Sequence, residues 1–252
     1  MRILITGNKS GLGRYLYEDM GEVGLSRDIS REKREQIKKE GADVIIHCAF
    51  SSDKEVNSKT LYSYVDDNVF LTKELVDYPH KKFIFFSSVD IYPKNKIIHF
   101  EDETIDINAV SGVYPITKLI SESIVRKHCQ NYLILRGTAF LGKYSRKNTL
   151  IKIIEKQNPA LTVTADSEFN YVLHSDIADF LRFAIKEDIR GVYNLASSEN
   201  ITISQVVKML TKRIKFGNYY YNVGKINNNK IASIFPTFKK TSREIINQFI
   251  KQ

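Results

Sequence analysis

Short apolar runs alternate with amphipathic segments over the first two thirds of the chain. Continuous runs of Ile, Val, Leu and Phe are typical of strands buried on both faces of a parallel sheet. Such strands are predicted at residues 2–6, 22–26, 42–52, 81–93, 132–142 and 191–197. Helical segments are predicted between them, at residues 14–20, 30–40, 60–78 and 114–129. This alternation predicts an α/β fold with a Rossmann-type, doubly wound parallel sheet.

The regular alternation breaks after Gly142. Beyond it we predict a helix and a short strand at 161–164, a strand-turn-helix at 171–186, a helix in 201–214 and an amphipathic helix near the C-terminal end. The predicted organisation is therefore a dinucleotide-binding Rossmann core in residues 1–142, with strands returning from about 170–197. A smaller substrate-binding lobe is predicted from residues 143–170 and 198–252.

Length and composition narrow the class of protein. The 252 residues, 42% of them hydrophobic, are enough for one large α/β domain with a small appendage. No signal-peptide pattern is seen, and no apolar run approaches the ~20 residues that span a bilayer. Two cysteines form no disulfide framework, and Cys48 is predicted to be a core residue. We expect a cytoplasmic protein with no membrane partner.

The net charge of +9 is the one unusual feature of the composition. Lys and Arg are interleaved with Asp and Glu through the helical segments, which favours a solvated surface together with an anionic small ligand. No zinc-ligand spacing, RNP-like aromatic motif or basic helix is present. The sequence therefore predicts neither a metal site nor a nucleic-acid partner.

The first predicted strand runs directly into the loop GNKSGLG. Glycines in such a strand–loop–helix context allow a tight turn and bring the backbone close to a pyrophosphate, which then lies at the positive end of the helix. A purely structural glycine turn is the alternative. Cofactor contacts are predicted for Gly7, Ser10, Gly11, Leu12 and Gly13, and for Ala49 and Phe50 in the strand at 42–52.

The end of the second strand bears on the choice of cofactor. An acidic residue here binds the ribose diol of NAD, whereas an arginine suits the 2′-phosphate of NADP. Ser26 and Arg27 favour NADP, while Asp28 next to them keeps NAD open. For Arg27 taken alone, a charged surface turn is an equal alternative.

Tyr114 and Lys118 lie four residues apart, so they share one face of the predicted helix at 114–129. A phenol titrates near ~10, and an ammonium beside it favours the phenolate and lowers that pKa. A tyrosine tuned in this way can exchange a proton with a sugar oxygen while a hydride moves. The alternative is a half-buried tyrosine with a solvated lysine one turn away. His47, inside a buried strand, is predicted to be a satisfied core residue.

Eight segments in order resemble the extended short-chain dehydrogenases/reductases, the NAD-dependent epimerase/dehydratase family. They are TGNKSGLG, ADVIIHCA, the helix carrying Asn68, FFSSVDIY, YPITKLISE, ILRGTAFLG, YVLHSDIADF and GVYNLAS. The glycine loop departs from the usual extended spacing at Ser10 and matches that of the single-domain members.

The resemblance implies an NAD(P)-dependent oxidoreductase that acts on a nucleotide-diphosphate sugar. By the same resemblance, Tyr114 is the catalytic acid/base, Lys118 orients the cofactor ribose, and Ser88 hydrogen-bonds the reacting oxygen. It also implies a homodimer formed through the tyrosine-bearing helix and the helix before it.

The residues after Ser88 separate reaction types within the family. Family dehydratases carry Asp-Glu there, and this chain has Val89 and Asp90, which disfavours dehydration. The string SSVDIYPK is similar to the SSCIYPK of GDP-fucose synthases, and SRDIS is similar to the NADP-binding arginine segment of that group. We therefore predict an NADPH-dependent reductase of a 4-keto nucleotide sugar. A nucleotide-sugar 4-epimerase and a non-catalytic dinucleotide-binding protein are the alternatives.

Several residues keep two interpretations at this stage. His174 and Asp90 have either a catalytic or a structural part. The cations Lys143, Arg146 and Lys147 bind a diphosphate or are solvated. Tyr219, Tyr220 and Tyr221 stack on a base or pack the smaller lobe. The nucleotide and the sugar are not identified by the sequence.

Overall fold

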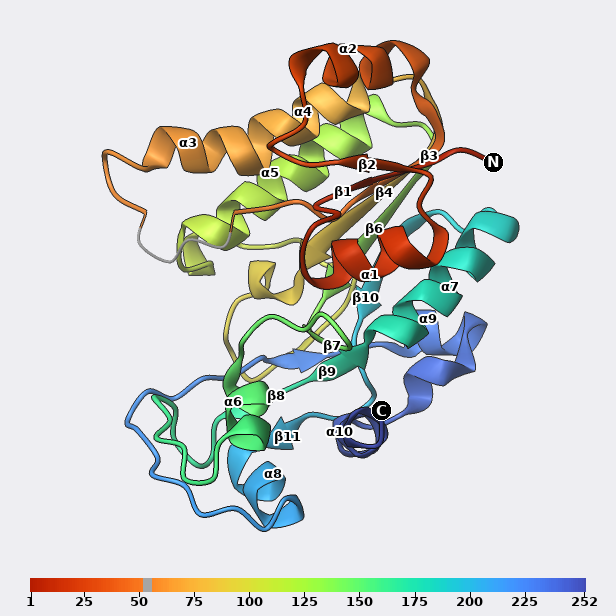
Figure 1. The fold of residues 1–252 in the computed structure, drawn as a ribbon. Coiled ribbons are helices and arrows are strands. Elements are labelled where there is room, and N and C mark those ends of the chain that lie inside the picture. The colour runs from red at the N-terminus through yellow and green to blue at the C-terminus, as the bar shows by residue number, and fades with distance from the viewer. Residues whose placement is uncertain (52–55) are drawn as a thin grey trace.

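A six-stranded parallel sheet forms the centre of the molecule (Figure 1). The computed structural model describes residues 1–51 and 56–252. Across the sheet the order is β10–β6–β4–β3–β1–β2. These strands are β1 (Ile3–Thr6), β2 (Val23–Leu25), β3 (Ala42–His47), β4 (His80–Ser88), β6 (Tyr132–Gly137) and β10 (Gly191–Leu195). The predicted α/β class and doubly wound sheet are confirmed.

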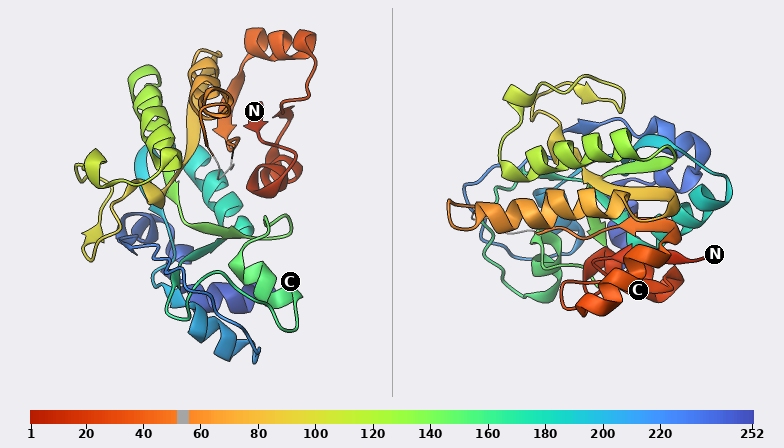
Figure 2. Two further views of the ribbon diagram at one scale, coloured as in Figure 1. Left: turned by 90° about the vertical axis from the view of Figure 1, so that its left-hand side faces the viewer. Right: turned by 90° about the horizontal axis from the view of Figure 1, so that it is seen from above.

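Helices cover both faces of the sheet, as Figure 2 shows from the side and from above. Helices α1 (Gly11–Met20) and α7 (His174–Lys186) pack on one face, through Leu16 and Phe180 among others. Helices α2 (Arg31–Glu40), α4 (Leu71–Val76) and α5 (Val113–His128) pack on the other. The strands are thus buried on both sides, which explains their continuous apolar runs.

The strand order reverses between β1 and β3, because the chain moves outward to β2 and then returns past β1. The loop after β1 and the loop after β3 therefore leave the sheet in diverging directions at its carboxyl end. In open α/β sheets, such a switch point is where ligands bind. The fold places the glycine loop at this position.

The predicted helix at 60–78 is one continuous helical segment with a wider turn inside it. It consists of α3 (Leu61–Val65), a π-helical turn η1 (Asp66–Phe70) and α4. Asn68, in the π turn, accepts a hydrogen bond from the Ser51 amide at 2.8 Å and donates to the Tyr64 carbonyl at 3.0 Å. The π turn thus directs a side-chain amide at the segment that follows β3.

Shorter elements lie beyond the carboxyl edge of the sheet, in the lower half of Figure 1. Several of them share a separate apolar cluster that includes Leu150, Tyr171, Ile203 and Ile246. The remaining elements are β5 (Ile98–His99), β7 (Ala139–Leu141), β8 (Glu168–Phe169), β9 (Tyr171–Leu173), β11 (Ile201–Thr202), β12 (Lys225–Ile226), α6 (Thr149–Glu155), α8 (Ile203–Met209), α9 (Asn229–Ile234), α10 (Ser242–Ile250), and the 3₁₀ turns η2 (Val89–Ile91), η3 (Ile107–Ala109) and η4 (Pro236–Lys239).

All six predicted sheet strands are longer than the observed ones, and three of them differ by more than two residues. The run at 42–52 is a strand only to His47, and Ser52 lies outside the described residues. The run at 81–93 ends at Ser88, whose side chain accepts from the Asp90 amide and caps the turn η2. The run at 132–142 divides at Thr138 into β6 and β7, and β7 pairs with β9 in a separate sheet.

The predicted strand at 161–164 is wrong. Two isolated bridges, Ala160 to Lys215 and Val163 to Tyr219, replace a regular ladder. The two bridges are three residues apart on one segment (160–163) but four residues apart on the other (215–219). The extra residue on the second segment interrupts the pairing.

The predicted helix at 201–214 is also too long. Thr202 caps α8 as expected for a Ser/Thr N-cap, but the helix stops at Met209, and Thr211 has a positive φ of 49°.

Candidate active site

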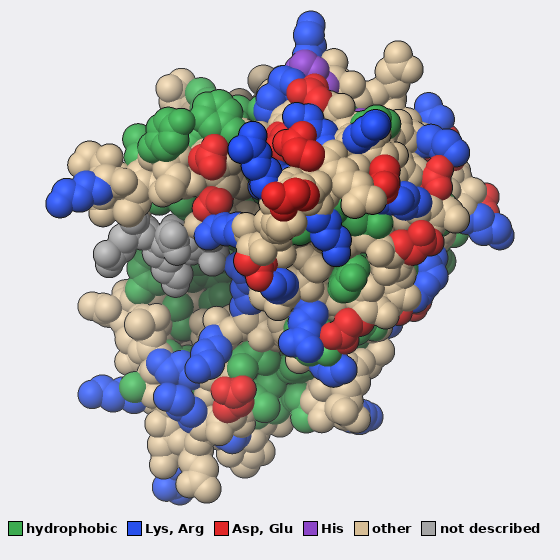
Figure 3. Space-filling view, turned by 45° about the horizontal axis from the view of Figure 1, so that its top comes forward, with side chains coloured by type: hydrophobic (Ala, Val, Ile, Leu, Met, Phe, Trp, Pro, Cys, Tyr) green, Lys and Arg blue, Asp and Glu red, His purple; other side chains and the backbone are tan. Residues whose placement is uncertain are grey.

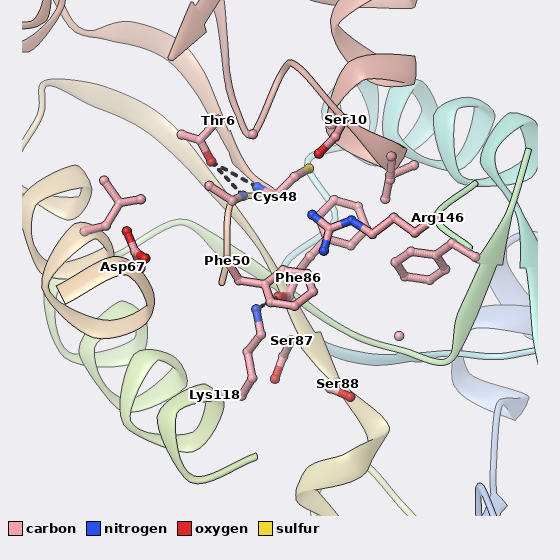
Figure 4. A pocket seen from close by; sticks show the side chains of 18 of the residues that line it. Thr6, Ser10, Cys48, Phe50, Asp67, Phe86, Ser87, Ser88, Lys118 and Arg146 are labelled. Atoms are coloured by element: carbon pink, nitrogen blue, oxygen red, sulfur yellow. Dashed lines mark hydrogen bonds between the residues drawn. The ribbon is translucent and has the colours of Figure 1, made fainter. Parts of the chain in front are cut away.

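A cavity of about 920 Å³ opens at the switch point, between the carboxyl ends of the strands and the lower elements (Figure 4). Each residue that the sequence nominated for the site lines it. They are Gly7, Ser10, Gly11, Leu12, Gly13, Ser26, Arg27, Ala49, Phe50, Ser88, Tyr114 and Lys118. Their separate roles stay predictions, but the structure brings them into one space.

The glycine loop fits a dinucleotide because two of its positions leave no room for a side chain. Gly7 has a φ of +69°, and a Cβ there would lie 3.0 Å from the Cα of Ala49. A Cβ on Gly13 would lie 2.4 Å from the carbonyl oxygen of Gly7. Helix α1 therefore starts in close contact with the loop, and the backbone can approach a bound pyrophosphate.

Thr6, the residue directly before the glycine loop, also lines the cavity, and the sequence did not single it out. Its hydroxyl oxygen accepts hydrogen bonds from the amides of Cys48 and Ala49, at 3.1 and 3.0 Å. Thr6 is the last residue of β1, next to the glycine loop, and this position could have identified it from the sequence as a residue of the site. Thr6 fixes the turn that presents Ala49 and Phe50 to the cavity.

Charged side chains surround the far end of the cavity, beyond β2. Arg27 forms an ion pair with Asp67 of η1. The Asp28 carboxylate accepts from the Ser26 hydroxyl at 2.6 Å and pairs with Lys9. These hydrogen bonds, that of Lys9 first, lower the pKa of Asp28 to about 2, so its carboxylate is ionised. Arg27, predicted to favour NADP, and Asp28, predicted to keep NAD possible, both lie at this end of the cavity.

Lys118 is almost completely buried on α5. Its Nζ donates to the carbonyl oxygen of Phe86 at 2.8 Å and lies 4.8 Å from the centroids of the Phe50 and Phe85 rings. Burial lowers the pKa of Lys118 to about 7. The amine therefore changes charge near neutral pH.

The expected lowering of the Tyr114 pKa is wrong. Burial and then the negative charge of Asp90 raise the pKa well above 10, and the nearby Ser88 side chain opposes this by hydrogen bonding. The ammonium of Lys118 lies 5.9 Å from the Tyr114 ring centroid and is directed at the Phe86 carbonyl. Tyr114 is consequently a protonated phenol at neutral pH.

Ser88 and Asp90 lie where β4 ends. The Oγ of Ser88 accepts from the Asp90 amide at 3.1 Å, and the Asp90 carboxylate accepts from Lys94 at 2.8 Å. Residues 88–90 all line the cavity, and the Val89 side chain is buried. Among the described residues, the carboxylate that follows Ser88 at this end of the cavity, that of Asp90, is thus already paired with a lysine.

His47 is confirmed as a satisfied core residue, since its ring nitrogens contact the hydroxyls of Thr6 and Thr72 at 2.8 and 3.0 Å. Burial lowers its pKa to about 3. His174 is buried but lines the cavity, and burial lowers its pKa to about 4. Cys48, expected in the core, is half-buried and lines the cavity with a thiol whose pKa burial raises to about 12. These three groups are uncharged at neutral pH.

The three cations after β7 separate in the structure. Arg146 lines the cavity, Lys147 lines a neighbouring depression, and Lys143 lies 3.8 Å from Glu18 of α1. Tyr221 lines the cavity, while Tyr219 and Tyr220 are exposed. Among the described residues, no cluster of His, Cys, Asp and Glu could hold a metal ion, and no helix is long and apolar enough to cross a membrane.

The fold and the cavity together define a dinucleotide-binding α/β protein, and the comparison with known families agrees. The model of the NAD dependent epimerase/dehydratase family matches residues 3–196. The chain belongs to this family, and the predicted type of NAD(P)-dependent short-chain dehydrogenase/reductase is confirmed.

Individual relatives are distant. A UDP-glucose 4-epimerase from Vibrio cholerae is 25% identical over 163 residues, which are 60% of this chain and 50% of that protein. The chain thus spans half the length of this curated relative.

Two solved structures share the fold over nearly their full length. A dTDP-4-dehydrorhamnose reductase from Bacillus anthracis, in complex with NADP, has a TM-score of 0.78 and 15% identity, covering 99% of this chain and 98% of that one. A UDP-glucuronic acid 4-epimerase from Bacillus cereus, in complex with UDP-glucuronic acid and NAD, has a TM-score of 0.76 and 16% identity, covering 96% and 94%.

Proposed function

We propose that the protein is an NADPH-dependent reductase of a 4-keto nucleotide-diphosphate sugar. The observation that carries this proposal is the single cavity that joins the glycine loop to Ser88, Tyr114 and Lys118. Asp90, the carboxylate two residues after Ser88, is paired with Lys94, so the described residues after β4 offer no free acid–base pair for dehydration.

When bound, the nicotinamide supplies the hydride. The residues of the chain supply the position and the proton. Ser88 donates a hydrogen bond to the carbonyl oxygen of the sugar. Tyr114, protonated at neutral pH, gives its phenolic proton to that oxygen as the alkoxide forms. Lys118 holds the ribose and, when charged, stabilises the phenolate that remains.

The charge distribution supports an anionic substrate. Residues 143–170 and 198–252 contain fifteen Lys and Arg against five Asp and Glu, a net +10, which leaves 23 against 24, a net −1, for the remainder. Figure 3 shows Lys and Arg side chains gathered at the lower left of the molecule, the side on which α6 lies in Figure 1. A nucleotide diphosphate entering on this side is attracted to the segments proposed to bind it.

A nucleotide-sugar 4-epimerase is the second candidate. The Vibrio cholerae relative and the Bacillus cereus structure favour it, since both are named as 4-epimerases. An epimerase first takes a proton from a sugar hydroxyl, and the raised pKa of Tyr114 suits the donation of a proton better. We therefore keep the reductase first.

A homodimer through α5 and the segment α3–η1–α4 is part of the proposal. Ile120 on α5 is 44% exposed and Leu61 on α3 is 45% exposed, although both are large apolar side chains and neither lines the cavity. The exchange Ile120→Glu should convert a dimer into monomers in light scattering after size exclusion. A wild-type monomer would contradict this part of the proposal.

The direct test is a screen of 4-keto and reduced nucleotide sugars with NADPH and NADH, with product stereochemistry determined by NMR. Net oxidation of NADPH with a 4-keto nucleotide sugar is expected for the reductase. Interconversion of two hydroxyl epimers without net oxidation would establish the epimerase instead. In either case Tyr114→Phe should lower turnover by about 10²-fold or more while the cofactor still binds.

A further inference from the structure

Arg146 reaches out of the smaller lobe and into the dinucleotide end of the cavity. A Cβ on Gly11 of the glycine loop would lie 3.5 Å from its Nε and 3.7 Å from its Cγ. Its guanidinium carbon lies 4.9 Å from the centroid of the Phe50 ring. Figure 4 shows the side chain extending into the pocket towards Phe50. The arginine therefore lies beside the loop that is expected to hold the pyrophosphate.

The charge of Arg146 has no partner in the described part of the chain, where it forms no ion pair and no hydrogen bond through its side chain. Phe50 has Arg146 on one side and Lys118, at 4.8 Å, on another, so two cations share one ring. The described acidic residues of the cavity lie elsewhere, beyond β2, on η1 and α4, and after β4. Among the described residues, Lys9 of the glycine loop is neutralised by Asp28, whereas the guanidinium of Arg146 beside the same loop is not neutralised.

The loop that carries Arg146 is fastened to the Rossmann core. The Tyr144 hydroxyl donates to the Glu18 carboxylate of α1 at 2.6 Å, and the Arg14 guanidinium lies 4.0 Å from the centre of the Tyr144 ring. The Ser145 hydroxyl accepts from the Gly142 amide at 2.7 Å, which tightens the turn before Arg146. These contacts hold the backbone in place, so Arg146 is directed at the glycine loop before any ligand arrives.

We propose that Arg146 binds the diphosphate of the dinucleotide cofactor beside the first residue of helix α1, and is not a ligand of the sugar-nucleotide diphosphate. The inference rests on the proposed function, because it takes the cavity to be a dinucleotide site. The glycine loop supplies backbone amides and the positive end of α1. Arg146 supplies a guanidinium, which matches phosphate oxygens in pairs.

The experiment is a titration of the full-length protein with NADPH, followed by cofactor fluorescence and by calorimetry. Arg146→Ala should weaken binding by about 10- to 100-fold, as for the loss of a hydrogen-bonded ion pair. Arg146→Lys should recover part of the loss, since the charge remains but the paired geometry does not. Lys147→Ala, a charge loss at the next residue and outside the cavity, should change the dissociation constant less than about twofold.

A truncated ligand locates the contact on the cofactor. Adenosine 2′-monophosphate lacks the diphosphate, so Arg146→Ala should bind it as well as the wild type does. Equal loss for both ligands would overturn the assignment, because it would indicate a disturbed fold. Unchanged NADPH affinity with a raised KM for the nucleotide sugar would overturn it as well, and would assign Arg146 to the substrate. Failure of the wild type to bind either dinucleotide would overturn the proposed function and this inference together.

Discussion

The ammonium of Lys118 donates its hydrogen bond to the main-chain carbonyl of Phe86, at 2.8 Å, rather than to the phenol one helical turn away. Spacing on a helix placed Tyr114 and Lys118 on one face, but spacing does not fix the direction of a long side chain. Burial lowers the pKa of Lys118 to about 7. Its charge state therefore depends on what occupies the cavity.

We expect dinucleotide binding to take up a proton above pH 7. A bound anion favours the ammonium, so the pKa of Lys118 rises on binding. Below pH 7 the amine is charged in both states and affinity is level. As the pH rises above about 7, binding must first protonate the amine, and affinity falls. Calorimetry at pH 8 in two buffers of different ionisation enthalpy measures this uptake.

The matched variants for that measurement are Lys118→Met and Lys82→Met. Lys82 is also buried with a lowered pKa, yet it does not line the cavity. The buffer dependence should vanish in the first variant and persist in the second. Identical heats in both buffers for the wild type would contradict the prediction, because they would show that Lys118 does not change its charge on binding.

Two neighbouring residues should change the cofactor preference in opposite directions. Arg27→Ala removes the cation suited to a 2′-phosphate, and we expect the NADPH-to-NADH affinity ratio to fall about tenfold. Asp28→Ala removes an ionised carboxylate, and the ratio should rise. Dissociation constants for both cofactors in each variant give the ratio directly. A ratio unmoved by either change would place the adenosine ribose elsewhere.

Parts of the site that depend on chain order and backbone could be predicted from the sequence. Strand ends of a parallel sheet meet at one edge, so the glycine loop after β1, Ala49 after β3 and Ser88 at the end of β4 had to gather there. A buried strand also identifies a satisfied histidine such as His47. These features follow from the order of strands and loops along the sequence.

Parts that depend on side-chain direction could not be predicted. Tertiary packing determines where the side chains of Arg146 and Lys118 point and which residue pairs with Asp90. The local sequence pattern around these residues does not predict that packing. The same holds for the lengths of irregular elements. The segment at 161–164 alternates like a strand, but the register of its partner, with one extra residue, prevents a ladder.

Gly13→Ala should disrupt the site through the backbone. A Cβ there would lie 2.4 Å from the carbonyl oxygen of Gly7, so the helix or the loop must move. We expect loss of measurable NADPH binding and a destabilised fold. Gly191→Ala is the control, since nothing lies within 4 Å of a Cβ there, the residue does not line the cavity, and its positive φ costs about 1 kcal/mol. Equal NADPH binding by Gly13→Ala and the wild type would contradict the proposed position of the cofactor.

A buried ion pair between α5 and β6 should contribute strongly to the free energy of unfolding. Arg136 on β6 donates to both carboxylate oxygens of Glu122, at 3.1 and 2.9 Å, and both side chains are 2% exposed. Glu122→Gln leaves the guanidinium charge uncompensated in the interior. The free energy of unfolding in urea should fall by about 3–5 kcal/mol.

Arg126→Gln tests the same carboxylate from outside. Arg126 also pairs with Glu122, at 3.0 Å, but it is 43% exposed, so its loss should cost less than about 1 kcal/mol of unfolding free energy.

The pH dependence of the unfolding free energy gives a second test of the Glu122–Arg136 ion pair. Burial opposes the ionised form of Glu122, yet Arg136 outweighs it and lowers the pKa below 4.5. The stabilisation from this group is therefore present above pH 4.5 and is lost as the pH falls through the folded pKa. The wild type should lose this stabilisation on acidification, whereas Glu122→Gln lacks it at every pH, so the gap between their unfolding free energies should narrow. A gap that stays constant down to pH 3 would show that the ion pair does not carry the difference.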